Sequence, residues 1–157
     1  MNVQGQPRII VLGIGNPLRR DDGAGIRAIQ ELWKKECAPD VQYLDGGTSP
    51  DLPSLIEPGV EKLVIVDALQ GGKEPGYIYR LELDASHMPD QAPESLHGLG
   101  LLDGLKMLNM LGRQPRHVIL IGIEPSDTSH GLQLSQQLES RLPALVEAVE
   151  KETLPPY

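Results

Sequence analysis

Three short runs of the chain are apolar almost throughout, at residues 9–15 (IIVLGIG), 63–68 (LVIVDA) and 118–123 (VILIGI). Continuous runs of this length, rich in Ile and Val, are typical of strands that helices cover on both faces. Two further candidates are residues 41–45 and residues 77–83, and the polar interruptions of the second favour an edge strand. The pattern therefore predicts a sheet of about five strands.

Apolar residues at helical spacing predict helices in the chain outside these runs, over residues 22–36, 98–111 and 132–151. The apolar face of the first segment includes Trp33, and Pro143 predicts a kink or a restart in the third. Strands that alternate with helices indicate an α/β fold of three layers, in which a twisted, mostly parallel sheet of about five strands is flanked by helices on both faces.

A chain of 157 residues is the size of one domain, so we expect residues 1–157 to fold as a single unit. Its formal net charge of -8 is poorly suited to neutralising the phosphates of a nucleic acid. Cys37 is the only cysteine, so the fold cannot depend on an internal disulfide. There is no basic region ahead of the first apolar run, and no run approaches the ~20 residues that span a bilayer. We expect a cytoplasmic monomer without nucleic-acid or membrane partners.

The stretch GIGNPLRRDDGAG, residues 13–25, follows the first predicted strand and raises the question of a nucleotide-binding loop. A dinucleotide fingerprint needs a third glycine where this chain has Leu18. Asp45, at the end of the next predicted strand, partly favours nucleotide binding, although it lies 30 residues after Gly15; the fingerprint places its acid about 20 residues on. No G-K-[ST] follows, so a Walker loop is excluded.

Adjacent aspartates, Asp21 and Asp22, lie in the same stretch. We expect Asp21 to cap the helix that follows, because Asp is a favoured N-cap residue. Asp22 would then point from the first helical turn into the crevice where open α/β sheets bind ligands. Asp67 ends another strand directly after four apolar residues, where an acid is costly to bury without a cation, a donor or water. A hydrogen bond to a neighbouring loop amide is the structural alternative to a ligand role for Asp67.

His97 is the histidine that we single out as a candidate ligand, because it lies where the second helix is predicted to begin. A lone histidine of this kind is more often structural. With Asp22 and Asp67 it could make an open site for a borderline divalent ion such as Zn, Ni or Co. Such a metal would polarise a carbonyl or activate a water for amide hydrolysis. The other histidines are expected at the surface, at His87, His117 and His130.

Side-chain nucleophiles have less support. Cys37 follows KKE near the end of the first predicted helix, where the helix dipole disfavours a thiolate. No G-x-S-x-G elbow occurs in the chain, so a serine hydrolase has no support. We therefore take an activated water as the hypothetical attacking group.

Four motifs resemble those of the maturation endopeptidases of nickel-iron hydrogenases. They are GIGNPLRRDDGAG at 13–25, DGGTSP at 45–50, LVIVDA at 63–68 and LHGLGLLDGL at 96–105. The resemblance runs in order from about residue 8 to residue 150. Four motifs in order over nearly the whole chain are far more specific than any one of them.

This resemblance implies a five-stranded twisted sheet between helices and a metal-guided endopeptidase activity. The implied reaction is a single hydrolytic cut that removes a C-terminal extension from the hydrogenase large-subunit precursor after nickel has been inserted. Asp22, Asp67 and His97 would bind the nickel, which the precursor supplies, and zinc or another divalent ion is a conceivable substitute. Asp22 and Asp67 are also the expected catalytic carboxylates, in an aspartyl endopeptidase-like role.

The DGGTSP segment forms a glycine-rich turn that could bind an extended peptide or merely reverse the chain. The resemblance favours peptide recognition, so we expect substrate contacts from Asp45, Gly46, Gly47, Thr48 and Asn16. Two alternatives remain open at this point. One is a nickel-handling chaperone that cuts nothing, and the other is an α/β module that binds a nucleotide or another small molecule.

Overall fold

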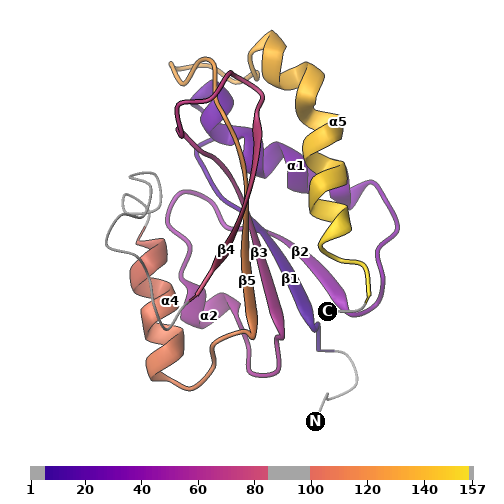
Figure 1. Ribbon diagram of the computed structural model, residues 1–157, viewed down its shortest axis with the longest axis vertical. Helices are drawn as coiled ribbons and strands as arrows, with labels where there is room; N and C mark the ends of the chain where they lie inside the picture. The colour runs from indigo at the N-terminus through magenta and orange to yellow at the C-terminus, as the bar shows by residue number, and fades with distance from the viewer. Residues whose placement is uncertain (1–5, 85–99, 156–157) are drawn as a thin grey trace.

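The computed structural model describes residues 6–84 and 100–155, and Figure 1 shows how its elements are arranged. In chain order these are β1 (Ile9–Gly13), the 3-10 helix η1 (Arg20–Gly23), α1 (Ala24–Trp33), β2 (Val41–Asp45), α2 (Leu52–Leu55), β3 (Lys62–Ala68), β4 (Ile78–Leu83), α4 (Leu101–Met110), β5 (His117–Ile123) and α5 (Gln136–Lys151). Each segment predicted as a strand contains one.

The strands form one sheet in the order β2-β1-β3-β5-β4. All neighbouring pairs are parallel except β4 and β5, which are antiparallel, and β4 is an edge strand. The prediction of a mostly parallel sheet with residues 77–83 at an edge is therefore confirmed. Because β2 lies on one side of β1 and β3 on the other, the carboxyl ends of β1 and β3 flank the point where open sheets bind ligands.

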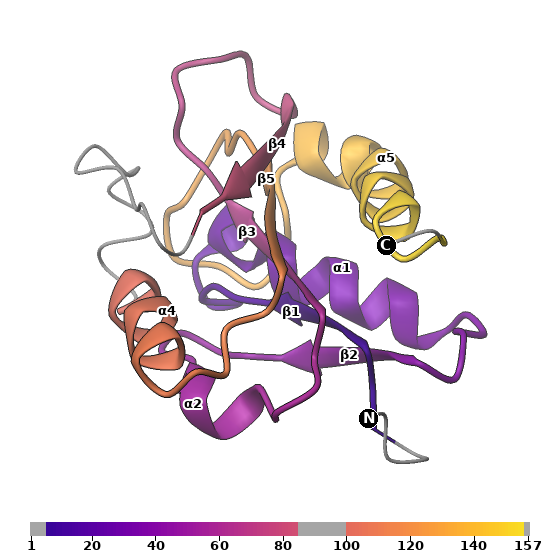
Figure 2. The ribbon, with the colours of Figure 1, turned by 60° about the horizontal axis from the view of Figure 1, so that its bottom comes forward.

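Helices cover both faces of the sheet, which confirms the predicted three-layer α/β fold. Figure 2 shows α1 and α5 on one side of the sheet and α2 and α4 on the other. Side chains alternate between these layers along each strand, as the strand period requires. In β1, Ile9 and Val11 pack with α1 and α5, whereas Ile10 and Leu12 pack with α2 and α4. The sheet is thus buried on both faces at its centre.

The first predicted helix differs from the structure at both ends. Asp22 lies in the tighter turn η1, and the α-helix begins only at Ala24. Trp33 was predicted on the apolar face, but this is wrong because its side chain is 54% exposed. Its indole N–H donates to the carbonyl oxygen of Tyr43 at 3.1 Å, which brings the side chain to the edge strand β2.

The helix does not restart at Pro143, because α5 runs unbroken through that residue, and the kink given as the other outcome stays a prediction. Proline lacks the N–H that would bond to the carbonyl four residues earlier. The buried residues Leu142, Leu145 and Val146 surround Pro143 and pack on the sheet, so tertiary burial holds the helix together there. With 16 residues, α5 is the longest helix in the described ranges, and none of the helices there is long and apolar enough to cross a membrane.

Candidate functional site

Asp67 lies at the carboxyl end of β3 and is only 2% exposed. Its Oδ1 atom accepts a hydrogen bond of 2.8 Å from the backbone N–H of Ala68. Burial raises the pKa of the Asp67 carboxyl well above its usual value, the nearby charge of Asp22 raises it further, and the Ala68 N–H partly opposes both effects. A buried acid of this kind at a ligand-binding edge is a candidate functional group.

Asp22 approaches the same place from η1, and both acids lie near Gly15, which follows the end of β1. Its carboxyl group is less buried than that of Asp67, and its Oδ2 atom accepts a hydrogen bond of 3.0 Å from the backbone N–H of Asn16. Both sequence-predicted carboxylates are therefore together in the structure, close enough for one to change the pKa of the other.

Two glycines allow the two acid-bearing segments to come this close. A Cβ at Gly15 would lie 2.0 Å from the carbonyl oxygen of Asp22 and 3.6 Å from Oδ1 of Asp67, and Gly15 has a φ of +134°. A Cβ at Gly25 would lie 2.2 Å from the carbonyl oxygen of Val66. The glycines of this stretch thus pack backbone against backbone around the acids. Asp22, an acid in the first turn of η1, would repel a phosphate bound at this turn, which weighs against the nucleotide alternative.

The glycine-rich turn after β2 lies beside the same loop. Gly46 N–H donates to the Gly13 carbonyl at 2.7 Å, and Gly15 N–H donates to the Gly47 carbonyl at 3.0 Å. Within the turn, Gly47 N–H donates to Oδ1 of Asp45 at 2.9 Å. Thr48 follows with an exposed side chain. The predicted substrate-binding residues of this turn are therefore adjacent to the loop that follows β1, and their role in binding stays a prediction.

Asn16 connects the loop to the acids through its backbone, since its N–H binds Asp22. Its side-chain oxygen accepts a hydrogen bond of 2.9 Å from the N–H of Leu18 and so closes a turn in the loop. The contact between Asn16 and substrate stays a prediction.

The expected N-cap role of Asp21 is wrong. Its carboxylate makes no cap hydrogen bond to η1 or α1 and instead binds the segment that follows β5. An Asp caps a helix only where its side chain turns back on that helix, and the Asp21 carboxylate is instead occupied by donors from the segment after β5.

Glu124 is a buried acid that the sequence analysis did not single out. It directly follows β5, is 5% exposed, and its carboxylate accepts hydrogen bonds from the Gly71 N–H at 3.2 Å and the Tyr79 hydroxyl at 3.1 Å. It thereby holds the loop that follows Asp67 and β3. The signal was available, because an acid at the end of an apolar run is the same feature that identified Asp67.

His97, the third predicted metal ligand, lies outside the described residues, as does His87. Within residues 6–84 and 100–155, no three His, Cys, Asp or Glu side chains are grouped so that they could hold a metal ion. Asp22 and Asp67 alone supply two oxygen donors whose mutual repulsion a divalent cation would relieve. The donor set therefore fits a cation that binds with the help of other ligands.

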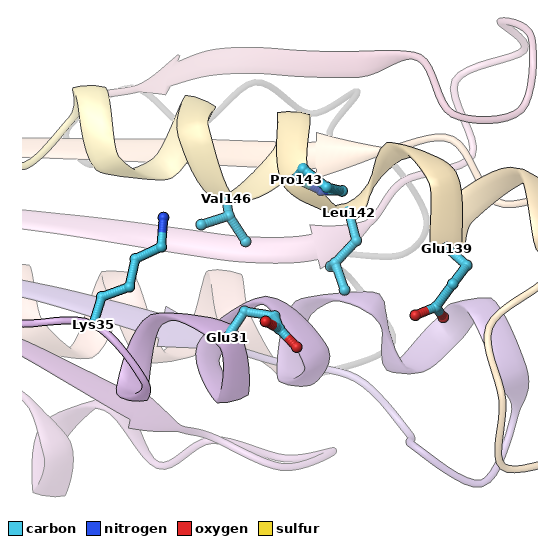
Figure 3. Close-up of a pocket in the computed structure, with 6 residues that line it drawn as sticks. All are labelled: Glu31, Lys35, Glu139, Leu142, Pro143 and Val146. Atoms are coloured by element: carbon cyan, nitrogen blue, oxygen red, sulfur yellow. The ribbon is translucent and has the colours of Figure 1, made fainter.

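A separate pocket lies between α1 and α5 and has a volume of about 320 Å³. Figure 3 shows Glu31 and Lys35 facing it from the α1 side, with residues of α5 opposite. None of the candidate residues lines this pocket. The candidate residues Asp22, Asp45 and Asp67 lie instead after β1 and at the ends of β2 and β3, and their chemical role stays a prediction.

Residues 26–152 match the model of a family described as hydrogenase maturation protease. The chain is 40% identical over 129 residues to the hydrogenase expression/formation protein HupD of Bradyrhizobium diazoefficiens. The aligned region covers 76% of this chain and 64% of HupD. The chain thus spans just under two thirds of that relative. It is 31% identical over 144 residues to the hydrogenase 2 maturation protease of Escherichia coli, covering 90% of this chain and 88% of that protein.

Solved structures agree with these relatives. The hydrogenase maturating endopeptidase HybD from E. coli superposes with a TM-score of 0.79 at 30% identity, covering 92% of this chain and 91% of HybD. The nickel-iron hydrogenase maturation protease HybD from Thermococcus kodakarensis gives a TM-score of 0.73 at 29% identity, covering 94% and 99%. The resemblance seen in the four motifs is confirmed, and the chain belongs to the hydrogenase maturation protease family.

Proposed function

We propose that this chain is an endopeptidase that removes the C-terminal extension of a nickel-iron hydrogenase large-subunit precursor and recognises the nickel that the precursor carries. Family membership supports peptide-bond hydrolysis in hydrogenase maturation. The observation that carries the proposal for this particular chain is the pair formed by buried Asp67 and half-buried Asp22 beside the ends of β1 and β3.

The electrostatics of the pair support recognition of a metal that arrives with the substrate. Burial and the charge of Asp22 both favour the protonated form of Asp67 and raise its pKa. Since a metal ligand must be ionised, the raised pKa of Asp67 opposes the binding of nickel there. We expect this raised pKa to offset part of the gain when a free cation binds the two carboxylates, so that the precursor's own ligands are needed to complete the coordination. His97 remains the third proposed ligand.

Hydrolysis then requires a water and a group that accepts its proton. A carboxylate held at a fixed position can serve as that general base. Asp22 is the better candidate, because its Oδ2 is oriented by the Asn16 N–H and its side chain is less buried than that of Asp67. The glycine-rich turn of Gly46 and Gly47 lies next to the loop that follows β1 and offers backbone groups to an extended peptide.

The deciding experiment mixes the chain with three forms of the precursor, namely nickel-loaded, zinc-loaded and metal-free, and follows the mass of the precursor. We expect cleavage of the nickel-loaded form and little or none of the metal-free form. Asp22→Asn should abolish cleavage while the folded precursor still binds, and Glu147→Gln, an exposed acid on α5, is the matched control.

Each outcome distinguishes a different hypothesis. Equal cleavage of all three precursor forms would remove nickel recognition from the proposal and keep the endopeptidase. Full activity of Asp22→Asn would remove Asp22 from the mechanism. Transfer or binding of nickel without any cut would favour the nickel-handling chaperone instead.

A further inference from the structure

Asp21 is a fully buried carboxylate, with 0% of its surface exposed, in the turn next to Asp22. Its Oδ2 atom accepts hydrogen bonds of 2.8 Å from the N–H of Ser126, the N–H of Asp127 and the hydroxyl of Ser135. Its Oδ1 atom accepts one of 2.7 Å from the N–H of Ser135. All four donors belong to the segment between β5 and α5, here called the β5 exit segment (residues 124–135).

The backbone of the turn is joined to the same segment. Asp21 N–H donates to the Asp127 carbonyl at 3.0 Å, and Arg20 N–H donates to the Gly131 carbonyl at 3.0 Å. In the other direction, Gly131 N–H donates to the Leu18 carbonyl at 2.9 Å. Figure 1 shows the chain after β5 passing the turn at the end of the sheet where η1 lies. Two segments more than 100 residues apart in sequence are thus fastened together at this edge.

The η1 turn contains a strained backbone conformation. Arg20 has a φ of 42°, the only positive φ of a non-glycine residue in residues 6–84 and 100–155. Such backbone strain persists only when surrounding contacts determine it. Asp21 lies between the strained residue Arg20 and Asp22. Its hydrogen bonds to the β5 exit segment are therefore placed to maintain the strained turn.

We propose that Asp21 is a positioning residue that fixes the η1 turn on the β5 exit segment and thereby keeps the Asp22 carboxylate beside Asp67. Ser135 extends this connection, because its hydroxyl also accepts from the Leu138 N–H and caps α5. The inference rests on the proposed function, since it concerns the acid that we assign to the reaction.

The chemistry requires a carboxylate at position 21. Four donors converge on its two oxygens, and an ionised carboxylate is an acceptor only. In Asp21→Asn, the new amide group would have to point its own N–H bonds at Ser135 N–H or at the three donors on the other oxygen. The substitution keeps the volume of the side chain and removes its ability to accept all four bonds.

The test compares Asp21→Asn, Ser135→Ala and the control Glu147→Gln. Single-turnover cleavage of nickel-loaded precursor is measured together with binding of the precursor and amide hydrogen exchange. The Asp22 amide is a direct reporter of the turn, because it donates to the Arg19 carbonyl at 3.0 Å. Misplacement of a catalytic group by about 1 Å can cost about 100-fold in rate.

We expect Asp21→Asn to lower the cleavage rate by about 100-fold, to leave precursor affinity within a factor of about three, and to speed exchange at the amides of Asp22, Ser126 and Asp127. Ser135→Ala removes one of the four bonds to the Asp21 carboxylate together with the cap on α5, retains the backbone donor, and should show the same pattern with a smaller effect. It also serves if Asp21→Asn does not fold.

Wild-type cleavage by both variants would overturn the inference. So would a loss of cleavage and of precursor binding in equal proportion, which is the behaviour of a merely unfolded fraction. Failure of the wild-type chain to cut the precursor would instead contradict the proposed function. In that case unchanged exchange at Asp22 in both variants would still overturn the positioning role, and faster exchange confined to the turn and the β5 exit segment would still support it.

Discussion

The Asp67 carboxyl is buried beside the Asp22 carboxylate, and burial first, then the charge of Asp22, raise its pKa. The folded chain therefore binds a proton at Asp67 more tightly than the unfolded chain does. This arrangement is unfavourable to the fold at neutral pH and is typical of a group retained for its chemistry.

Asp67→Asn should stabilise the chain at neutral pH and abolish cleavage of the precursor. Because the folded pKa is raised, the stability that the protonated carboxyl provides is fully present below the unfolded pKa of about 3.9. It is lost as the pH rises through the folded pKa, by about 1.4 kcal/mol for each unit of the increase. The uncharged amide avoids this loss, and its oxygen can still accept from Ala68 N–H.

Urea unfolding of the wild-type chain and of Asp67→Asn from pH 3 to pH 8 measures this effect. We expect the free energies of unfolding of the two proteins to approach each other in acid and to diverge as the pH rises, with the variant the more stable. A constant difference across the whole range would contradict the raised pKa.

Gly15→Ala should disrupt the site even though it adds a single methyl group. The new Cβ would meet the Asp22 carbonyl oxygen at 2.0 Å, a distance that requires the backbone of the acid-bearing turn to move. We expect loss of cleavage and a destabilisation of about 3 kcal/mol or more. Thermal unfolding and the precursor assay measure the two effects.

Gly72→Ala is the matched control for that variant. Gly72 also has a positive φ, of +84°, but nothing lies within 4 Å of its added Cβ. Alanine there should cost only the backbone strain, about 1–2 kcal/mol, and leave cleavage intact. Equal effects of the two substitutions would show that backbone strain, and not the contact with Asp22, is responsible at position 15.

The fold could be predicted from sequence because the apolar runs decide it locally. Residues 63–68 and 118–123 are buried on both faces of the sheet, so their strands show directly as uninterrupted Ile, Leu and Val. Asp67 was found by the same signal, as an acid that ends such a run. Helix details were less accurate, since the burial of residues around Pro143 overrides its local preference to break the helix.

The role of Asp21 could not be predicted in the same way. Locally, an aspartate just before a helix favours an N-cap. In the fold, donors from Ser126 and Ser135, which are 105 and 114 residues away, satisfy its carboxylate instead. Contacts between segments so distant in sequence depend on the assembled topology, and no local pattern in one sequence reveals them.

Glu124→Ala should destabilise the loop that follows Asp67. The substitution leaves the Gly71 N–H and the Tyr79 hydroxyl without their acceptor. Gly71 is exposed and Tyr79 is half-buried, so water can partly replace the lost acceptor, and we expect a loss of about 1 kcal/mol and slower cleavage. Glu124→Gln keeps one oxygen, which can accept from both donors, and should behave much more like the wild type. Equal defects in both variants would mean that the charge of Glu124, rather than these two hydrogen bonds, is what matters.

Glu152→Gln should reduce stability most clearly above pH 5 and flatten its loss in acid. Glu152 joins α5 to the sheet through Lys62, whose Nζ lies 2.8 Å from Oε2, and through Arg80. Burial would raise the pKa of Glu152, but the hydrogen bonds from Arg80 and Lys62 outweigh it and lower the pKa. A lowered folded pKa gives stability that is present above the unfolded pKa, about 4.3, and is lost as the pH falls through the folded pKa.

The size of that effect follows from the exposure of the partners. The side chains of Glu152 and Lys62 are 10% and 12% exposed, whereas that of Arg80 is 54% exposed and more strongly screened. We therefore expect a loss of about 1–3 kcal/mol at pH 7, below the usual range for a fully buried pair. Urea unfolding from pH 3 to pH 7 should show a shallower decline in Glu152→Gln than in the wild type, with Glu147→Gln unchanged. Glu152 has no role in the proposed reaction, so the folded fraction of Glu152→Gln should cleave the precursor at the wild-type rate. A loss of cleavage larger than the loss of folded protein would contradict this expectation.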